Sequence, residues 1–571
     1  MRPVPTLALL ALTSLASPPA AQAADGGAPV DAPVDGKRDD AGPTDDVPGP
    51  GACAEGAAVS EGDLITASSP QAGAGFGVEL APAGDVNRDG YRDLLVGEWR
   101  RSVGGAQRSG AVHLYLGAAS GLAGTPVLLA SPDPASNDEL GAALASGDVN
   151  GDGFVDVVLG AAGATTGGVA GGKVHLFLGG PGGLAASASW SASFEPESGA
   201  SFGISVLVAD VDGDGVGDLV VGADRATAAG VLRAGRVVVF RGSAGGPLSA
   251  PIEVRCPEPE EDAGFGASLA LLRGRDGGRW LAVGAPQATD EATRAGRVYV
   301  FRASALDGAP VALRPRVREL DGSFGFRLAT GDVNGDGDDD LLVGADRAAS
   351  GRGAAYLFLG RAVGPAASPG WQVTGDTAGA ALGSAVAAGD LDGDGVAEIL
   401  VGAPGSTRPR PEGPVLTGRV QAYRGAATIA ARPYLAIDGP APYGSFFGGS
   451  LALVTATATA PAWLAVGADQ RAGIGGAVGG VFTFKSCGVF HAPDGGTDTG
   501  ADGGSRDGPA RDGAPGRPPA QEGCGCQVGA ATRPPPLSPP LLVLAIWRRA
   551  RRRSSAAGVS RRNAIASSAS R

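Results

Sequence analysis

The sequence predicts an all-β fold, a seven-bladed β-propeller of four-stranded blades flanked by disordered linkers. Three observations lead to this prediction: a composition suited to turns, seven copies of one unit, and the lack of any long stretch with helical periodicity. Glycine accounts for 98 of the 571 residues and proline for 43, while 43% of the residues are apolar. This combination allows a large core built from short strands and tight turns.

The N-terminal segment has the features of a secretory signal. Arg2 precedes an apolar run from Leu7 to Leu15, and the small residues Ala21-Gln22-Ala23 follow as a cleavage site. Residues 1–23 are therefore expected to be a signal peptide. The protein is expected to be secreted or displayed at the cell surface, where disulfides persist and weak calcium sites fill.

Two segments are expected to be disordered linkers, residues 24–58 and residues 489–522. Both are rich in Asp, Pro and Gly and almost free of aromatic residues, so they cannot bury enough apolar surface to offset the entropy of ordering. The folded block is therefore expected to span residues 59–488.

Within this block one unit recurs seven times. Each copy opens with a small pair, at Phe76-Gly77, Leu140-Gly141, Phe202-Gly203, Phe265-Gly266, Phe324-Gly325, Leu382-Gly383 and Phe447-Gly448. A later apolar strand of each copy ends in glycine, at Gly97, Gly160, Gly222, Gly284, Gly344, Gly402 and Gly467, with separations of 63, 62, 62, 60, 58 and 65 residues by subtraction. A unit of this length cannot bury both of its faces alone, so radial stacking into a propeller is expected.

Each unit has three clear strands and room for a fourth, such as Val174 to Leu178 for a third strand and Pro251 to Arg255 for a fourth. The seventh unit lacks a fourth strand, and Asp63 to Ala67 is expected to supply it by pairing the two ends of the block. Cys53 and Cys487 flank these ends, which predicts a disulfide between them, with two free thiols as the alternative.

Five units carry an acidic pattern, Asp-x-Asp/Asn-x-Asp-Gly-x-x-Asp/Glu, between their first and second strands. The predicted ligands are Asp85, Asn87, Asp89, Tyr91 and Asp93 in unit one; Asp148, Asn150, Asp152, Phe154 and Asp156 in unit two; Asp210, Asp212, Asp214, Val216 and Asp218 in unit three; Asp332, Asn334, Asp336, Asp338 and Asp340 in unit five; and Asp390, Asp392, Asp394, Val396 and Glu398 in unit six. The fourth residue of each set contributes its backbone carbonyl. Alternating carboxylates with a glycine at the sharp turn wrap oxygens around one point.

Oxygen-only ligation selects calcium, so five calcium sites are predicted. An EF-hand would need a bidentate Glu where Leu159 stands, so the loop is expected to be a β-hairpin instead. The alternative for any single loop is a polar turn without an ion, but five copies in one register argue against it. Five calcium ions would offset most of the formal net charge of -13.

Units four and seven lack the acidic loop. Trp280 and Trp463 stand where the other units have their last ligand, and both precede the sequence Leu-Ala-Val-Gly-Ala. An apolar cap is expected to replace the ion in these units, which suggests that the role of the ion is structural.

These features resemble the FG-GAP repeat family, the seven-bladed propellers of integrin α subunits and many bacterial surface proteins. The resemblance rests on the Phe-Gly pairs, on Gly-Ala-Pro at 284–286 and 402–404, and on the acidic loops, and it covers residues 63–488. It implies calcium loops on a lower face and ligand recognition on an upper face. Loops on that upper face carry Arg100, Arg101, Arg108, Arg225, Arg233, Arg347, Arg352, Arg408 and Arg410.

These arginines favour an extracellular protein with an acidic patch or an anionic glycan as the partner, although solvated arginines without a ligand are an equal alternative. The negative net charge opposes nucleic-acid binding. The three His residues of the sequence are scattered and form no cluster, so a binding or adhesion module is expected and an enzyme is not. An extracellular hydrolase or lyase on a propeller scaffold, or a passive scaffold, are the rival functions.

The C-terminal region resembles the myxobacterial sorting tail. It has Cys524-Gly525-Cys526, an apolar run from Leu541 to Trp547, and an arginine cluster from Arg548 to Arg553. The resemblance implies a sorting tail at residues 523–553, followed by a polar tail at 554–571. Membrane contact is expected only through this region. Its apolar run departs from the family pattern, because it is shorter than the ~20 residues needed to span a bilayer.

Overall fold

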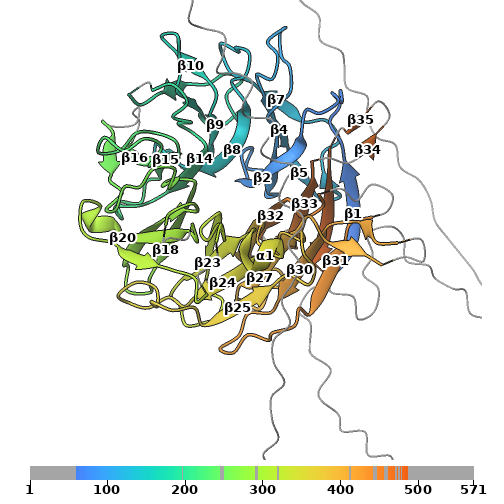
Figure 1. Cartoon of the computed structure of the whole chain (residues 1–571). Helices are drawn as coiled ribbons and strands as arrows, with labels where there is room; N and C mark the ends of the chain where they lie inside the picture. Colours follow the sequence, from blue (N-terminus) through green and yellow to red (C-terminus); the bar gives the residue numbers. More distant parts are fainter. Residues whose placement is uncertain are drawn as a thin grey trace, which may run out of the picture. The chain divides into compact units, whose positions relative to one another are not determined.

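The computed structural model describes residues 59–486, apart from residues 196, 245–249, 290–293, 318–319, 410–412, 441–445, 456–460, 470–471, 474–475 and 478. These described residues form seven four-stranded antiparallel sheets around a common axis (Figure 1). The predicted seven-bladed propeller is therefore confirmed. Helical segments within this part of the chain are the short η1 (Ala303–Ala305) and α1 (Ala348–Gly351), and none reaches the length and apolarity needed to cross a membrane.

The strands of each blade follow one another from the axis outward. Blades 1 to 3 are β2 (Phe76–Gly84), β3 (Asp93–Glu98), β4 (Ala111–Tyr115) and β7 (Val127–Leu129); β8 (Leu140–Gly147), β9 (Asp156–Ala161), β12 (Lys173–Phe177) and β13 (Trp190–Ala192); and β14 (Ser205–Ala209), β15 (Asp218–Ala223), β16 (Arg236–Phe240) and β17 (Ile252–Val254). Blades 4 to 6 are β18 (Ser268–Arg273), β19 (Arg279–Ala285), β20 (Arg297–Arg302) and β21 (Val311–Leu313); β22 (Arg327–Gly331), β23 (Asp340–Ala345), β24 (Ala354–Phe358) and β25 (Trp371–Thr374); and β26 (Ala385–Gly389), β27 (Glu398–Ala403), β30 (Arg419–Tyr423) and β31 (Leu435–Asp438).

Blade 7 combines the two ends of the folded block. It consists of β32 (Ser450–Val454), β33 (Trp463–Ala468), β36 (Gly480–Ser486) and, as its outer strand, β1 (Val59–Ile65). Small two-stranded hairpins project from four blades: β5 (Gly117–Ala118) with β6 (Gly121–Leu122), β10 (Thr165–Thr166) with β11 (Val169–Ala170), β28 (Thr407–Arg408) with β29 (Val415–Leu416), and β34 (Ala472–Gly473) with β35 (Gly476–Ala477).

The second strand of each blade is the most buried part of the fold. In β9, β15, β23 and β27 all six residues are buried, because neighbouring blades cover both faces of the sheet. These strands are accordingly continuous apolar runs without the alternation of a half-exposed strand. The predicted third strand Val174 to Leu178 and the predicted fourth strand Pro251 to Arg255 lie within one residue of the observed Lys173–Phe177 and Ile252–Val254.

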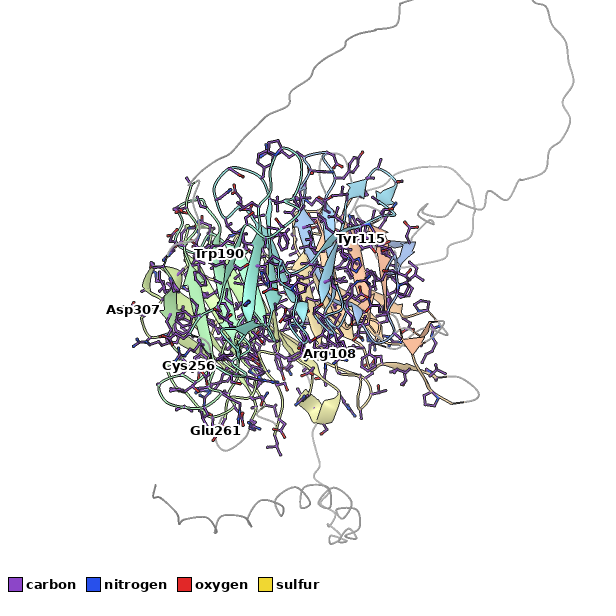
Figure 2. The ribbon with its side chains drawn as sticks, turned by 90° about the horizontal axis from the view of Figure 1, so that it is seen from above. Arg108, Tyr115, Trp190, Cys256, Glu261 and Asp307 are labelled. Carbon is purple, nitrogen blue, oxygen red and sulfur yellow. The ribbon has the colours of Figure 1, made fainter. Side chains whose placement is uncertain are left out.

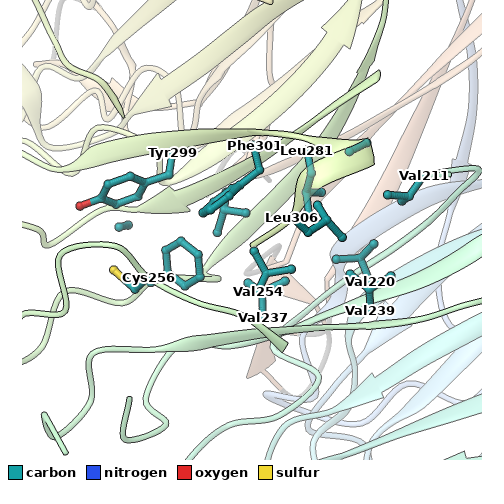
Figure 3. Packing of buried hydrophobic residues seen from close by; sticks show 14 of the residues in the cluster. Val211, Val220, Val237, Val239, Val254, Cys256, Leu281, Tyr299, Phe301 and Leu306 are labelled. Atoms are coloured by element: carbon teal, nitrogen blue, oxygen red, sulfur yellow. The ribbon is translucent and has the colours of Figure 1, made fainter. Parts of the chain in front are cut away.

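The opening Phe of a unit packs between two blades. Phe265 is fully buried and makes edge contacts with Tyr299 and Phe301, at ring-centroid distances of 5.8 and 6.1 Å. Valines of blade 3, including Val237 and Val239, cover the other side of this cluster (Figure 3). Cys256 belongs to the same cluster as a buried free cysteine, and burial raises the pKa of its thiol to about 11.

The N-terminal strand closes the ring, as predicted. β1 pairs antiparallel with β36, with Ile65 opposite Val481 and Val59 opposite Ser486. The observed strand begins four residues before the predicted Asp63 to Ala67, because a β-bulge at Gly62 and Asp63 lets the pairing continue toward Val59. The predicted Cys53–Cys487 disulfide, the signal peptide, both linkers and the sorting tail with Cys524 and Cys526 lie outside the described residues.

Removing β1 is expected to destabilise the ring. A chain that starts at Ala67 should have a lower Tm and a larger oligomeric fraction than a chain that starts at Ala58, because the edge of β36 is left unpaired and open to other copies. Thermal melts and light scattering on the two chains test this. Equal Tm and equal mass for both chains would show that the seam pairing is dispensable.

Candidate metal centres

The five acidic loops lie on one face of the propeller. Each loop joins the first strand of its blade to the second, and corresponding strands of all seven blades are related by rotation about the axis. Neighbouring loops are tied together: the N–H of Gly217 in blade 3 donates to the carbonyl of Asp148 in blade 2 at 2.7 Å. Between blades 1 and 2, Arg88 donates to the carbonyl of Gly153 and stacks on Phe154 at 3.4 Å. We call this side the loop face.

In each loop, the acids at the first and third ligand positions accept backbone N–H groups. In blade 2, the Asp148 carboxylate accepts hydrogen bonds from Gly151 and Gly153, both at 2.7 Å, and Asp152 accepts one from Phe154 at 2.8 Å. Gly153 has a φ of 81°, which permits the tight return of the chain. The same bond from the loop glycine to the first acid recurs in the other four loops, from Gly90, Gly215, Gly337 and Gly395.

The last acid of each loop is buried at the start of the second strand. Asp156 is 0% exposed, and its carboxylate accepts N–H groups from Val149 and Gly179, both at 2.8 Å. These bonds join the loop to the first and third strands of the blade. Equivalent bonds from the residue after the first acid reach Asp93, Asp218, Asp340 and Glu398.

Burial of these last acids disfavours their charged form. Desolvation raises the pKa of Asp93, Asp156 and Asp340 to about 6 and that of Glu398 to about 7, against the opposing effect of the backbone hydrogen bonds. The neighbouring carboxylates of the same loop add a smaller effect in the raising direction. A cation at the loop would reverse this balance by favouring the ionised carboxylates.

Carboxylate oxygens converge most closely in blades 3 and 6. Oxygens of Asp210, Asp212 and Asp218 lie within 4.8 Å of one another, and the same holds for Asp390, Asp392 and Glu398. In the other three loops the second ligand position is an asparagine, whose amide oxygen would take the place of a carboxylate. The donor set fits a hard divalent cation, because it consists of oxygens alone.

Two arginines that the sequence analysis did not identify contact the blade 3 loop. The guanidinium of Arg241 forms an ion pair with Asp212 and lies 3.5 Å from the Asp218 carboxylate. Arg279, from the second strand of blade 4, donates to Asp210 at 3.1 Å. In the blade 5 loop, the Asp338 side chain faces blade 4 and accepts the N–H of Arg275 at 2.9 Å, which leaves the predicted backbone role of Asp338 open.

Blade 4 has a tryptophan where a last ligand would be. Trp280 is 7% exposed and packs in the blade 4–blade 5 core cluster with Leu272 and Leu341. Gly278 approaches this indole so closely that a Cβ at residue 278 would lie 2.4 Å from the ring. An apolar cap therefore does occupy this position in blade 4.

The opposite face carries the loops between second and third strands. Figure 2 shows the propeller from its edge, with Arg108 and Glu261 toward this opposite face. Four of the arginines predicted there form ion pairs with carboxylates: Arg101 with Glu98, Arg108 with Glu139, Arg233 with Asp262, and Arg408 with Asp438. The face is therefore less basic than its arginine count suggests. Arg410 lies outside the described residues.

Comparisons with known proteins agree with this architecture. Residues 382–423 match the FG-GAP repeat family, and residues 148–221 and 332–401 match the FG-GAP-like repeat family. Integrin alpha-IIb of Homo sapiens is 40% identical over 24% of this chain and 14% of its own length, and integrin alpha-PS2 of Drosophila melanogaster is 32% identical over 38% and 16%. Phosphatidylinositol-glycan-specific phospholipase D of Homo sapiens is 34% identical over 27% of this chain and 19% of its own length.

The matched region thus spans less than a fifth of each of these relatives. All three family matches include or adjoin an acidic loop and its second strand. Residues 148–221 and 332–423 of this seven-bladed propeller thus match FG-GAP repeats, and the chain is similar to integrin alpha subunits.

Proposed function

We propose that this protein is a secreted or cell-surface binding module, with adhesion as its role, whose propeller is held in shape by five calcium ions. The observation that carries the proposal is the set of five acidic loops, which have one register and one hydrogen-bond pattern on one face. The integrin alpha relatives support the binding role that the family resemblance implies.

Each calcium ion would be held by the acids or asparagine of one loop and by the backbone carbonyl of Tyr91, Phe154, Val216, Asp338 or Val396. The bound ion supplies positive charge at a point where several carboxylates would otherwise repel one another. The chain supplies the backbone bonds that orient these carboxylates, and the last acid connects the loop to the strands. Calcium in this arrangement fixes the first hairpin of the blade.

The ligand-binding surface in this proposal is the face opposite the loop face. An anionic glycan or an acidic patch of an extracellular protein suits the arginines of this face, provided that the ligand competes with the acids paired to them. The similarity to a phosphatidylinositol-glycan-specific phospholipase D favours a hydrolase as the second candidate. A passive scaffold would neither bind nor turn over a ligand.

A binding array separates these functions. Incubation of the protein with arrays of glycans and surface proteins is expected to give calcium-dependent binding that a chelator abolishes. Turnover of a phospholipid or polysaccharide would favour the hydrolase instead. If the protein binds no array component saturably and turns over no substrate, the binding module is contradicted and the passive scaffold remains.

The stability of the protein is expected to depend on pH in opposite directions with and without calcium. Asp93, Asp156 and Asp340 have a pKa of about 6 in the fold and an ordinary value of 3.8, so the native state binds more protons between these values. In chelator, stability should therefore rise as the pH falls from 7 to 5, by roughly 1 kcal/mol for each carboxyl. In calcium it should fall over this range, because protons compete with the ion.

Thermal melts at several pH values, each with calcium and with chelator, measure this difference. Groups far from the loops, such as the buried His175 with a pKa lowered to about 4, affect both series equally and cancel in the comparison. Parallel pH profiles in calcium and in chelator would contradict the assignment of the ion to these acids.

A further inference from the structure

The loops of blades 3 and 6 differ from the other three at two positions at once. At the second ligand position they have Asp212 and Asp392, where the other loops have Asn87, Asn150 and Asn334. Directly after the third strand they have Arg241 and Arg424, where the other loop-bearing blades have Leu116, Leu178 and Leu359. In blades 4 and 7, which lack an acidic loop, the equivalent positions lie inside the longer third strands and hold the basic residues Arg302 and Lys485. Leucine therefore occurs at this position only together with asparagine.

The fold brings these two positions together. In blades 1, 2, 3 and 5 the residue after the third strand is followed by a glycine whose N–H donates to the last acid of the loop, as Gly242 does to Asp218 at 2.9 Å. The side chain of residue 241 therefore starts beside the carboxylates. Its guanidinium, with 26% of the side chain exposed, forms the ion pair with Asp212 and lies 3.5 Å from Asp218.

Blade 6 has an arginine and an aspartate at the same two positions. Arg424 is half-buried, stacks over the Tyr434 ring at 5.1 Å, and lies close enough to Asp392 for its charge to act on that carboxyl. In the other three blades the leucine joins the apolar core instead, as Leu178 does in the cluster between blades 2 and 3. The two blades whose loops have a fourth carboxylate are therefore the same two acidic-loop blades that have the arginine, and the arginine lies near that carboxylate.

Charge explains the pairing. Counted over the four side-chain ligand positions and the residue after the third strand alone, three carboxylates with an asparagine and a leucine give a charge of -3, and four carboxylates with an arginine give the same charge of -3. A fourth carboxylate without a partner would add repulsion to the ion-free loop and attraction for a cation. The arginine offsets both effects.

We propose that Arg241 and Arg424 are built-in counterions that hold the extra carboxylate of their loops and set the calcium affinity of these two sites. They keep the loops of blades 3 and 6 closed in the absence of the ion and bring their affinity to the level of the other three. The second part of this inference rests on the proposed calcium binding, and the first part does not.

A double-mutant cycle in blade 3 tests the proposal. The chains are the wild type, Asp212→Asn, Arg241→Leu and the double variant, which has the Asn and Leu of blades 1, 2 and 5. Arg279, which contacts Asp210, is unchanged in all four chains, so its contribution cancels. Urea unfolding in chelator and the calcium concentration at half-maximal Tm shift are measured for each chain.

In chelator, Arg241→Leu is expected to lower stability, and adding Asp212→Asn should restore most of the loss. In calcium titrations, Arg241→Leu should tighten half-saturation of this loop by about tenfold and Asp212→Asn should weaken it by about tenfold, with the double variant near the wild type. Hydrogen exchange of the backbone amides of residues 206–222 reports calcium binding at this loop separately from the other four loops. Asn150→Asp in blade 2, where Leu178 offers no counterion, is the matched control and should behave like Arg241→Leu.

Strictly additive effects of the two substitutions in chelator would overturn the counterion role. If calcium changes neither the Tm nor the exchange of any of the chains, the proposed calcium binding fails, while the cycle in chelator still decides whether Arg241 balances Asp212. If calcium raises the Tm of all four chains and binds the blade 3 loop with the same affinity in each of them, the arginine does not set the affinity.

Discussion

Removing calcium is expected to lower the Tm of the propeller more than any single conservative substitution. A site occupied at a hundredfold excess over its dissociation constant contributes about 2.7 kcal/mol, so five sites together contribute on the order of 10 kcal/mol. The acids that would hold the ions are hydrogen-bonded into the first hairpin of five blades, and the last acid of each is fully or almost fully buried. Without the ion, each hairpin has to keep several carboxylates close together.

Melting curves in calcium, in magnesium and in a calcium-selective chelator measure the effect. Calcium should raise the Tm by ten degrees or so above the chelated value, and magnesium should raise it less, because its near-octahedral demand does not suit these loops. An unchanged curve in chelator would contradict the calcium assignment for all five loops. A large calcium shift that survives only in chains with intact loops would support it.

Asp152→Ala provides the local version of this test. The substitution removes one ligand of the blade 2 loop and the acceptor for the Phe154 N–H, so it should reduce the calcium shift by about one fifth. Asp307→Ala is the control, because Asp307 is exposed and lies outside the acidic loops. It removes the same charge and should leave the calcium shift unchanged.

The blade count could be predicted from the sequence because one physical requirement recurs in every unit. Each second strand is covered on both faces, so it is an unbroken apolar run, and it ends in a glycine that lies against the next blade. The acidic loops were equally visible, since their ligands are neighbours in the chain. The pairing of the N-terminal strand with the last unit was predicted, although not its exact bounds, because the seventh unit lacked a fourth strand and the segment before the first unit could supply one.

Interactions between distant segments could not be predicted in the same way. The start of β1 depends on a bulge in which Gly62 and Asp63 oppose Thr483, whose hydroxyl accepts the Asp63 N–H at 2.9 Å. Arg279 reaches Asp210 from the next blade, and no local pattern marks this contact. Arg241 could have been found by aligning the repeats, because the equivalent position is a leucine in three units and a basic residue in the other four.

Gly222→Ala is expected to lower the free energy of unfolding strongly, although it adds only one methyl group to blade 3. A Cβ at this residue would lie 2.0 Å from the carbonyl oxygen of Gly266 in blade 4 and 2.2 Å from the Ser205 hydroxyl. The same hydroxyl donates to that carbonyl at 2.7 Å, so the methyl group would meet a hydrogen-bonded pair on both sides. Because the obstacle is the backbone of the next blade, relief requires blades 3 and 4 to move apart.

The expected loss for Gly222→Ala is about 3 kcal/mol or more, measured by urea unfolding in calcium. Gly182→Ala is the matched control, because nothing lies within 4 Å of a Cβ at that residue and its φ is ordinary. This control should be neutral or stabilise slightly, since alanine reduces the entropy of the unfolded chain. The difference between the two variants isolates the contact between blades from the general effect of replacing glycine. Similar unfolding midpoints for both variants would show that the blades can separate at little cost, and the repeat glycine would then need another explanation.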